Sequence, residues 1–372
     1  MRGEVAVDVS RRGAMSLIAG ALAASATASA QELKAQPSDE SKGKAAGRGC
    51  GRIDTHAHYI PASYRTALAD AGLATVDGGV TLPRWALADH VAMMDRHQIA
   101  VSVLSLSSPG VQFLNGRPAA KLARDVNEEG AAIGAAHPGR FGLLISLPLP
   151  DVQASLKELE YGFDTLKADG VVMMTNIQGR YLGDPEFLPV FEALDRRGAV
   201  LYLHPTAPCG LGPASLGMPA PVIEFPFDTV RAAVSLVYSG RLKNCPNLRL
   251  LLSHAGGALP MLASRIAAMS ALPLIEPRPA GGAEEVRTQF AKIYYDLALS
   301  ANPTAVNALR EITTLDHVTF GTDYPFSGNL GLDLNIRSFE AIKATLPQVD
   351  QRKLEFGNAL NLFPRLRAFL AG

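Results

Sequence analysis

Short runs of consecutive apolar residues recur from Gly51 onward and alternate with longer stretches that have helical spacing. A short continuous apolar run is typical of a strand that is buried on both faces, as in a parallel sheet. Eight runs predict strands, at Arg52–Thr55, Val101–Leu106, Phe141–Leu147, Gly170–Met174, Ala199–Leu203, Leu248–Leu252, Lys292–Leu297 and His317–Phe320. The stretches between them predict helices over Leu87–His97, Ala119–His137, Leu156–Lys167, Glu186–Arg197, Thr229–Leu242 and Pro303–Ile312.

This alternation predicts a fold of the α/β class. Eight consecutive strand and helix units close into a (β/α)₈ TIM barrel, which we expect to form a single catalytic domain over residues 51–372. The alternative is an open, doubly wound sheet, which usually carries a glycine-rich turn after its first strand. Here the first strand continues into THAHYIP, which has no such turn, so the barrel is favoured.

The first 50 residues do not share this pattern. Arg11 and Arg12 precede an apolar run at Leu17–Ala24 and a small-residue stretch that ends at Ala30, which is the order of a signal peptide with cleavage before Gln31. The arginine pair favours the twin-arginine route. The apolar run is shorter than the roughly 18 to 20 residues that a spanning helix needs. We therefore expect a signal over residues 1–30 and a flexible linker over 31–50. The mature protein would be periplasmic, or cytoplasmic if the signal does not function.

Composition limits the kinds of partner that we expect the protein to bind. The chain has 372 residues, of which 48% are apolar, enough to fill a large core. Its 35 basic and 35 acidic residues balance, so nothing suggests nucleic acid or an anionic membrane surface as a partner. Three widely spaced cysteines predict free or buried thiols and no disulfide framework, at Cys50, Cys209 and Cys245. A small molecule is the partner that remains.

Candidate chemistry gathers at the carboxyl ends of the predicted strands, where TIM barrels carry their reactive residues. His56 and His58 lie two residues apart and would therefore point to one face of the first strand. His204, His254 and Asp323 follow the fifth, sixth and eighth strands. Each could instead be a buried core histidine, a helix cap or a turn carboxylate. However, all of them converge on the carboxyl end of the barrel, here called its mouth, as a metal site requires. The other histidines fall in helical stretches or open a strand, at His90, His97, His137 and His317.

Four motifs carry a family resemblance. DTHAH, HPTAP, SHAGGALP and GTDYPF occur in this order and resemble the amidohydrolase superfamily, in particular its branch of metal-dependent non-oxidative decarboxylases typified by aminocarboxymuconate-semialdehyde decarboxylase. The similarity extends from Gly51 to about Phe363. Three further stretches resemble the 6-methylsalicylate decarboxylases within this branch, namely LSLSSPGVQF, HPGRFGLLISLPLPD and RYLGDPEF.

The resemblance implies roles for individual residues. One divalent metal ion per subunit would be bound by four of them: His56, His58, His204 and Asp323. Zinc is the first candidate metal, with manganese or cobalt as alternatives. His254 would lie unliganded beside the ion, and Arg265 would reach the substrate carboxylate of a neighbouring subunit, so a homodimer is implied. Where the muconate-semialdehyde enzyme supplies a second carboxylate-binding arginine, this chain reads Asp77-Gly78-Gly79-Val80, which favours a smaller monocarboxylate.

The expected reaction is decarboxylation of a small aromatic acid of the ortho-hydroxybenzoate type. A divalent cation can stabilise the phenolate while an adjacent acid, Asp323 or His254, protonates the ring carbon. One alternative is a hydrolase of an ester, lactone or amide that uses the same residues. Another is a non-enzymatic solute-binding or metal-carrying barrel. Aromatic residues that are plausible walls of a substrate pocket are Trp85, Phe113, Phe225 and Phe227.

Overall fold

A computed structural model describes residues 51–77, 79–210, 215–273 and 276–370. The predicted signal peptide and linker lie outside the described residues. Among the helices that are described, none is long and apolar enough to cross a membrane.

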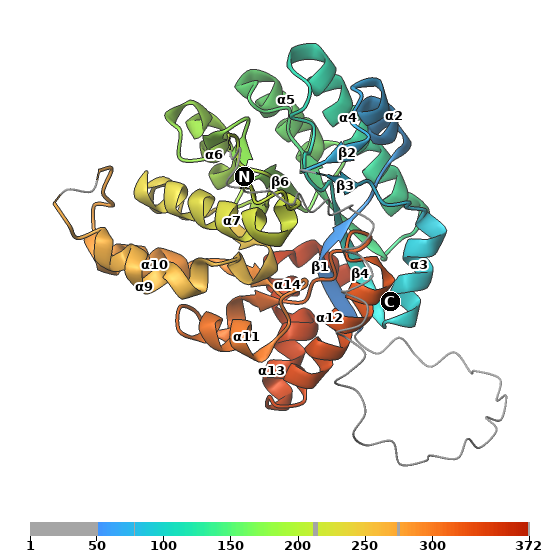
Figure 1. The fold of residues 1–372 in the computed structure, drawn as a ribbon. Coiled ribbons are helices and arrows are strands. Elements are labelled where there is room, and N and C mark those ends of the chain that lie inside the picture. The colour runs from blue at the N-terminus through green and yellow to red at the C-terminus, as the bar shows by residue number, and fades with distance from the viewer. Residues whose placement is uncertain (1–50, 78, 211–214, 274–275, 371–372) are drawn as a thin grey trace, which may run out of the picture. The chain divides into compact units, whose positions relative to one another are not determined.

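Eight parallel strands form one sheet, in the order β1-β4-β5-β6-β9-β10-β11-β12. The two outer members of this order meet, because Thr55 N donates to Phe320 O at 3.0 Å and His58 N donates to Tyr324 O at 2.8 Å. The sheet is therefore closed, and helices lie around its outside (Figure 1). The strands are β1 Arg52–His58, β4 Ile99–Ser105, β5 Phe141–Ser146, β6 Gly170–Met174, β9 Val200–His204, β10 Arg249–Leu252, β11 Tyr294–Asp296 and β12 Val318–Thr319.

The predicted (β/α)₈ barrel is confirmed, and the doubly wound alternative is wrong. Every residue of β5, β6 and β9 is buried, which is why these strands read as continuous apolar runs. All eight predicted strands are present, with ends that differ by a few residues. The main difference is at β1, which continues through His58, so His56 and His58 lie on the strand itself.

Within the described residues, the strands are accompanied by ten longer α-helices and four short ones. The longer ones are α2 Ala62–Asp70, α3 Leu87–Arg96, α4 Gly116–Ala136, α5 Val152–Asp164, α6 Leu188–Arg196, α7 Ala220–Tyr238, α9 Leu259–Met269, α10 Gly282–Lys292, α11 Pro303–Arg310 and α12 Gly328–Lys343. The short ones are α8 Arg241–Asn244, α13 Gln348–Arg352, α14 Asn358–Leu362 and α15 Arg367–Leu370.

The six predicted helices are all present, but α7 begins nine residues earlier than expected. The predicted helix did not include the residues before Thr229, whereas in the structure α7 also contains them, with Pro226 inside the helix. Two small hairpins, β2 Thr75–Val76 with β3 Val80–Thr81 and β7 Asn176–Ile177 with β8 Arg180–Tyr181, follow strands β1 and β6. Connections that follow barrel strands lie at the carboxyl face, so both hairpins border the mouth.

Candidate metal centre

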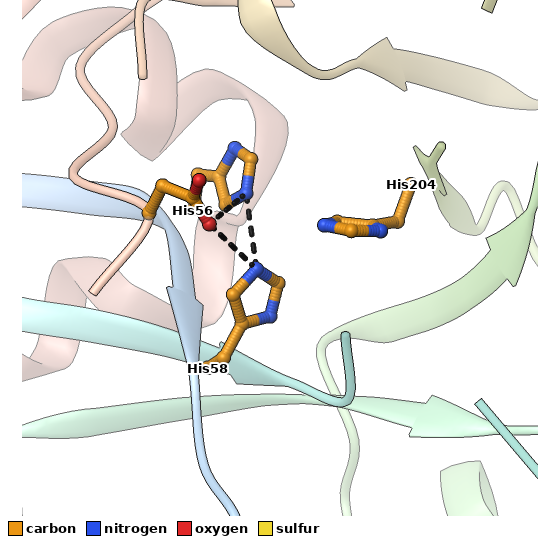
Figure 2. Close-up of side chains that lie close together, drawn as sticks. His56, His58 and His204 are labelled. Atoms are coloured by element: carbon orange, nitrogen blue, oxygen red, sulfur yellow. Dashed lines mark hydrogen bonds and ion pairs between the residues drawn. The ribbon is translucent and has the colours of Figure 1, made fainter. Parts of the chain in front are cut away.

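Four predicted ligands converge at the carboxyl end of the barrel. His56 and His58 lie at the end of β1, His204 ends β9, and Asp323 follows β12. All four are buried, and one ligand atom from each lies within 4.8 Å of the others. Figure 2 shows the three imidazoles turned toward a common point. The structure thus forms a metal-binding site from residues that are up to 267 positions apart, which is the separation of His56 and Asp323.

The distances among these atoms fit a divalent cation. His56 Nε2 lies 3.1 Å from His58 Nε2, and Asp323 Oδ1 lies 3.3 Å and 3.2 Å from the same two nitrogens. Atoms held about 2.0 to 2.1 Å from a tetrahedral zinc ion lie roughly 3.3 Å apart. Electron-rich atoms at this separation repel one another unless a proton or a cation lies among them. A nitrogen and carboxylate donor set of this kind suits zinc, manganese or cobalt.

Hydrogen bonds on the far side of each ring fix its orientation. His56 Nδ1 lies 2.9 Å from Asp296 Oδ2, and His204 Nδ1 lies 2.8 Å from the carbonyl of Pro205. His58 Nδ1 contacts the carbonyl oxygen of Ser105 at 3.2 Å. Because carboxylates and carbonyls accept, each Nδ1 carries the hydrogen. The Nε2 lone pairs are therefore directed at the common point, as metal-ligating histidines require.

The electrostatics of the group also suit a cation. Burial by itself lowers the pKa of His56, but the carboxylates of Asp296 and Asp323 outweigh burial and raise this pKa to about 10. Burial lowers the pKa of His58 and holds that of His204 well below its usual value. Burial would raise the pKa of Asp323, yet the neighbouring His56 and His58 hold it well below the ordinary range. The site thus favours positive charge at its centre, and a bound metal ion supplies that charge in place of a proton.

His254 lies beside the four residues. Its ring centroid is 4.8 Å from that of His56, and it belongs to a second group with His56 and Asp296. Its Nδ1 contacts the carbonyl of Ala298 at 2.9 Å, and its backbone N–H donates to Asp296 Oδ1 at 3.0 Å. The Ala298 carbonyl thus engages Nδ1 of the ring, and His254 also lines the cavity beside the four residues.

Two buried carboxylates that were not among the predicted site residues position the centre. Asp54 accepts from the backbone N–H of His56 at 3.1 Å and from Thr322 Oγ1 at 2.6 Å, which ties β1 to the segment after β12. Burial raises the pKa of Asp54 to about 7. Asp296 orients His56 and also accepts from Ala298 N. Asp296 ends the seventh strand, so the strand-end argument that found His204 also points to it.

The GTDYP segment is shaped for close approach to β1. A Cβ at Gly321 would lie 2.8 Å from the Cβ of His56, so a side chain there would push the two segments apart. Asp323 has φ of +58°, a left-handed conformation that aspartate tolerates better than most residues. Glycine and aspartate at these two positions therefore bring the Asp323 carboxylate against His56 and His58.

A cavity of about 390 Å³ opens on the metal site. This volume falls within the range for small-molecule sites. Its wall includes His204, His254 and Asp323 together with apolar residues, among them Val80, Phe225, Pro226, Leu299 and Phe326.

Of the four aromatic walls expected, Phe225 alone lines this cavity. Trp85 lies in a separate outer groove, where its Nε1 donates to His90 Nδ1 at 3.1 Å. Phe113 packs against Tyr64, and the side chain of Phe227 is 44% exposed. Arg265 is exposed on α9 and does not line the cavity of its own chain.

A TIM barrel in which three imidazoles and one carboxylate converge at the carboxyl face defines a class, that of metal-dependent barrel enzymes. The chain belongs to the amidohydrolase family, whose model matches residues 53–365. This confirms the resemblance that the four motifs indicated.

Known proteins of the family align over most of the chain. It is 39% identical over 325 residues to 6-methylsalicylic acid decarboxylase from Penicillium expansum, which covers 86% of this chain and 98% of that protein. A crystal structure described as amidohydrolase II superposes with a TM-score of 0.76 at 28% identity, covering 84% of this chain and 99% of the other. A dihydroxybenzoic acid decarboxylase from Polaromonas, solved with bound manganese, shares the fold with a TM-score of 0.71 at 24% identity, covering 84% and 97%.

Proposed function

We propose that the protein is a metal-dependent, non-oxidative decarboxylase of a small aromatic acid of the ortho-hydroxybenzoate type, such as 6-methylsalicylate. The observation that carries the proposal is the metal-binding group of His56, His58, His204 and Asp323, which opens on a cavity of small-molecule size. The relative from Penicillium expansum supports this reaction, since it acts on an acid of that class according to its name.

The four converging side chains would hold one divalent ion per subunit. The donor set accommodates zinc, manganese or cobalt, and the manganese in the Polaromonas structure makes that metal a candidate equal to zinc. Held by these residues, the ion would act as a Lewis acid that stabilises negative charge on a phenolate oxygen of the substrate.

The residues around the ion would carry the proton and exclude water. Decarboxylation breaks the bond between the ring and the carboxylate carbon, releases CO₂ and places one proton on the ring carbon. His254 and Asp323 both line the cavity and are the candidate proton carriers for this step. Because Ala298 engages Nδ1 of His254, its Nε2 would be the delivering atom. Phe225 and Phe326 would hold the ring in an apolar setting that keeps water from the reacting carbon.

Release of carbon dioxide from a panel of ortho-hydroxybenzoates by metal-loaded protein tests this function. We expect turnover of 6-methylsalicylate or a close analogue, with the corresponding phenol as product, and loss of turnover after chelation. Esters, lactones and amides of matched size should be inert. Hydrolysis of one of these, with no carbon dioxide from any acid, would instead establish the hydrolase alternative.

A homodimer with Arg265 acting across the interface is the proposed assembly. Arg265 lies on α9 one turn after Met261, which is 73% exposed, and Val222 on α7, next to the cavity-lining Pro221, is 58% exposed. Exposed apolar residues on these two helices favour contact with a second copy of the chain. Since Arg265 does not line its own cavity, a neighbouring cavity is the site where its guanidinium would meet a carboxylate.

Export through the twin-arginine route is also proposed, with residues 1–30 removed, residues 31–50 as a linker and the barrel domain starting at Gly51. The support is the sequence order of Arg11-Arg12, the short apolar run and the small residues before Gln31. Replacement of both arginines with lysine should leave unprocessed precursor in the cytoplasm. Normal export of that variant would exclude this route.

A further inference from the structure

The cavity wall contains a carboxylate that the proposed reaction does not use. Asp77 lies between the strands of the β2–β3 hairpin and lines the same cavity as His204, His254 and Asp323. Much of the surrounding wall is apolar, formed by residues such as Val80, Phe225 and Phe326. A charged group in such a wall costs solvation energy, so its presence calls for a partner.

One oxygen of Asp77 is anchored by the protein. Asp77 Oδ1 accepts from Ser108 Oγ at 2.8 Å, from Ala207 N at 3.3 Å and from Thr206 Oγ1 at 3.4 Å. Its backbone carbonyl accepts from Ala220 N at 3.0 Å, at the start of α7. These donors come from the segments after β4 and β9 and from a helix terminus. The carboxylate is therefore held by the segments after β4 and β9, and the backbone of Asp77 is held by the start of α7.

The other oxygen is left for a ligand. Within the described residues, every hydrogen bond to the Asp77 side chain goes to Oδ1 and none goes to Oδ2. Burial raises the pKa of Asp77, because the charged form is poorly solvated there, while its three donors lower it in part. A neutral hydroxyl that donates to Oδ2 would relieve this cost. A second anion in the cavity would increase it.

We propose that Asp77 is a specificity-determining residue that accepts a hydrogen bond from a ring hydroxyl of the substrate and excludes acids with a second carboxylate. The inference rests on the proposed function, since it names the substrate class of that same site. It favours dihydroxybenzoates and other hydroxyl-bearing monocarboxylates over hydroxybenzene dicarboxylates, because like charges in a poorly solvated cavity repel strongly.

The test compares matched acids and an isosteric variant. Salicylates with a further hydroxyl at ring position 3, 4 or 5 are assayed against salicylates with a carboxylate at the same position. Asp77→Asn keeps one oxygen for Ser108 and Ala207 and places an amide donor where Oδ2 was. Asp70→Asn, at an exposed residue that ends α2, is the control for the change in net charge. Metal content and thermal unfolding verify that both variants are folded and loaded.

We expect the wild-type protein to prefer a dihydroxybenzoate at least tenfold in kcat/KM over the matched dicarboxylate. Asp77→Asn should reduce this ratio at least tenfold, mainly through KM, and Asp70→Asn should leave it unchanged. Turnover of the acids with an unaltered ratio in Asp77→Asn would overturn the inference and leave the proposed function intact.

If neither these acids nor 6-methylsalicylate is decarboxylated, the proposed function fails by itself. Calorimetric binding of the same acids to manganese-loaded protein then decides the role of Asp77. Tighter binding of the hydroxyl compounds that Asp77→Asn abolishes would support the inference. Equal selectivity in the two proteins would overturn it.

Discussion

Polar groups at the two ends of the barrel differ in the partners that they meet. At the amino end, arginine side chains meet acceptors of the protein: Arg52 pairs with Glu340 and donates to the carbonyl of His97 at 3.3 Å. Arg249 similarly donates to the carbonyls of Gly198 at 3.2 Å and Leu362 at 2.8 Å. These contacts join the starts of strands to neighbouring segments, so these two arginines find their partners within the protein.

At the carboxyl end, the buried polar atoms that converge are all acceptors. His56 Nε2, His58 Nε2 and Asp323 Oδ1 converge within 3.3 Å, and His204 faces the same point. Bringing acceptors together without a cation costs stability, because each has lost water without gaining a donor. The comparison teaches that polar groups at the amino end stabilise the fold, whereas those at the mouth are arranged for a ligand.

Removal of one metal ligand should have the largest effect on the site at the carboxyl end. His56→Ala takes away an imidazole that contacts both His58 and Asp323, so the remaining set is incomplete. We expect elemental analysis to show about one divalent ion per wild-type subunit and loss of most of it in the variant. Decarboxylase activity should fall by ~10³-fold or more, with the fold retained in circular dichroism.

The matched control is His137→Ala, at the end of α4 and outside the metal site. This variant should keep both metal and activity. Full metal occupancy in His56→Ala would show that the ligand assignment is wrong.

His254 separates metal binding from proton transfer within the mouth. His254→Asn removes the ring nitrogen that would deliver the proton, while all four residues of the metal-binding group remain. We expect unchanged metal content, a similar KM and a kcat that is lower by about 10²- to 10⁴-fold, the usual contribution of a general acid. A kcat within a factor of a few of wild type would assign the proton to another residue, with Asp323 as the next candidate.

Arg265→Ala should have a smaller effect that depends on the partner chain. Loss of a guanidinium that pairs with the substrate carboxylate should lower kcat/KM by ~2 to 4 kcal/mol, or about 30- to 900-fold. A mixture with His56→Ala should regain part of the activity, because a mixed dimer contains one site with both residues intact. Arg310→Ala, exposed on α11, is the control. Absence of complementation in a verified mixed dimer would contradict action across the interface.

The sequence predicted the features that depend on local pattern. It missed those that depend on which way a helix turns its side chains. His204 and Asp323 were placed correctly because parallel strands all present their carboxyl ends to one face. Phe227 was assigned to the pocket, yet it is 44% exposed, whereas Phe225 two residues earlier lines the cavity. On a helix this difference depends on how α7 is rotated against the barrel, and no local pattern records that rotation.

Contacts between distant segments were equally hidden. The hydrogen bond between Asp77 and Ser108 joins residues 31 positions apart, and the one between Asp54 and Thr322 joins residues 268 apart. The first depends on how the β2–β3 hairpin packs against the segment after β4, and the second depends on closure of the barrel between β1 and β12. A strand-end aspartate such as Asp296 was accessible to the argument used for the histidines, but its role in orienting His56 required the structure.

The smallest expected effect tests the amino end. Asn358 on α14 is 1% exposed, and its Nδ2 donates to the carbonyls of Leu315 at 2.6 Å and Val318 at 2.7 Å, where β12 begins. Asn358→Ala leaves both carbonyls without this donor and should lower the free energy of unfolding by about 1 to 3 kcal/mol in denaturant titration. Asn361→Ala, an exposed asparagine on the same helix, should change it by less than ~0.5 kcal/mol. Because the contact stabilises the fold without reaching the mouth, metal content and kcat should be unchanged at a temperature where the variant is folded. Loss of metal in folded Asn358→Ala would show that the two ends are coupled and that the separation drawn between them is wrong.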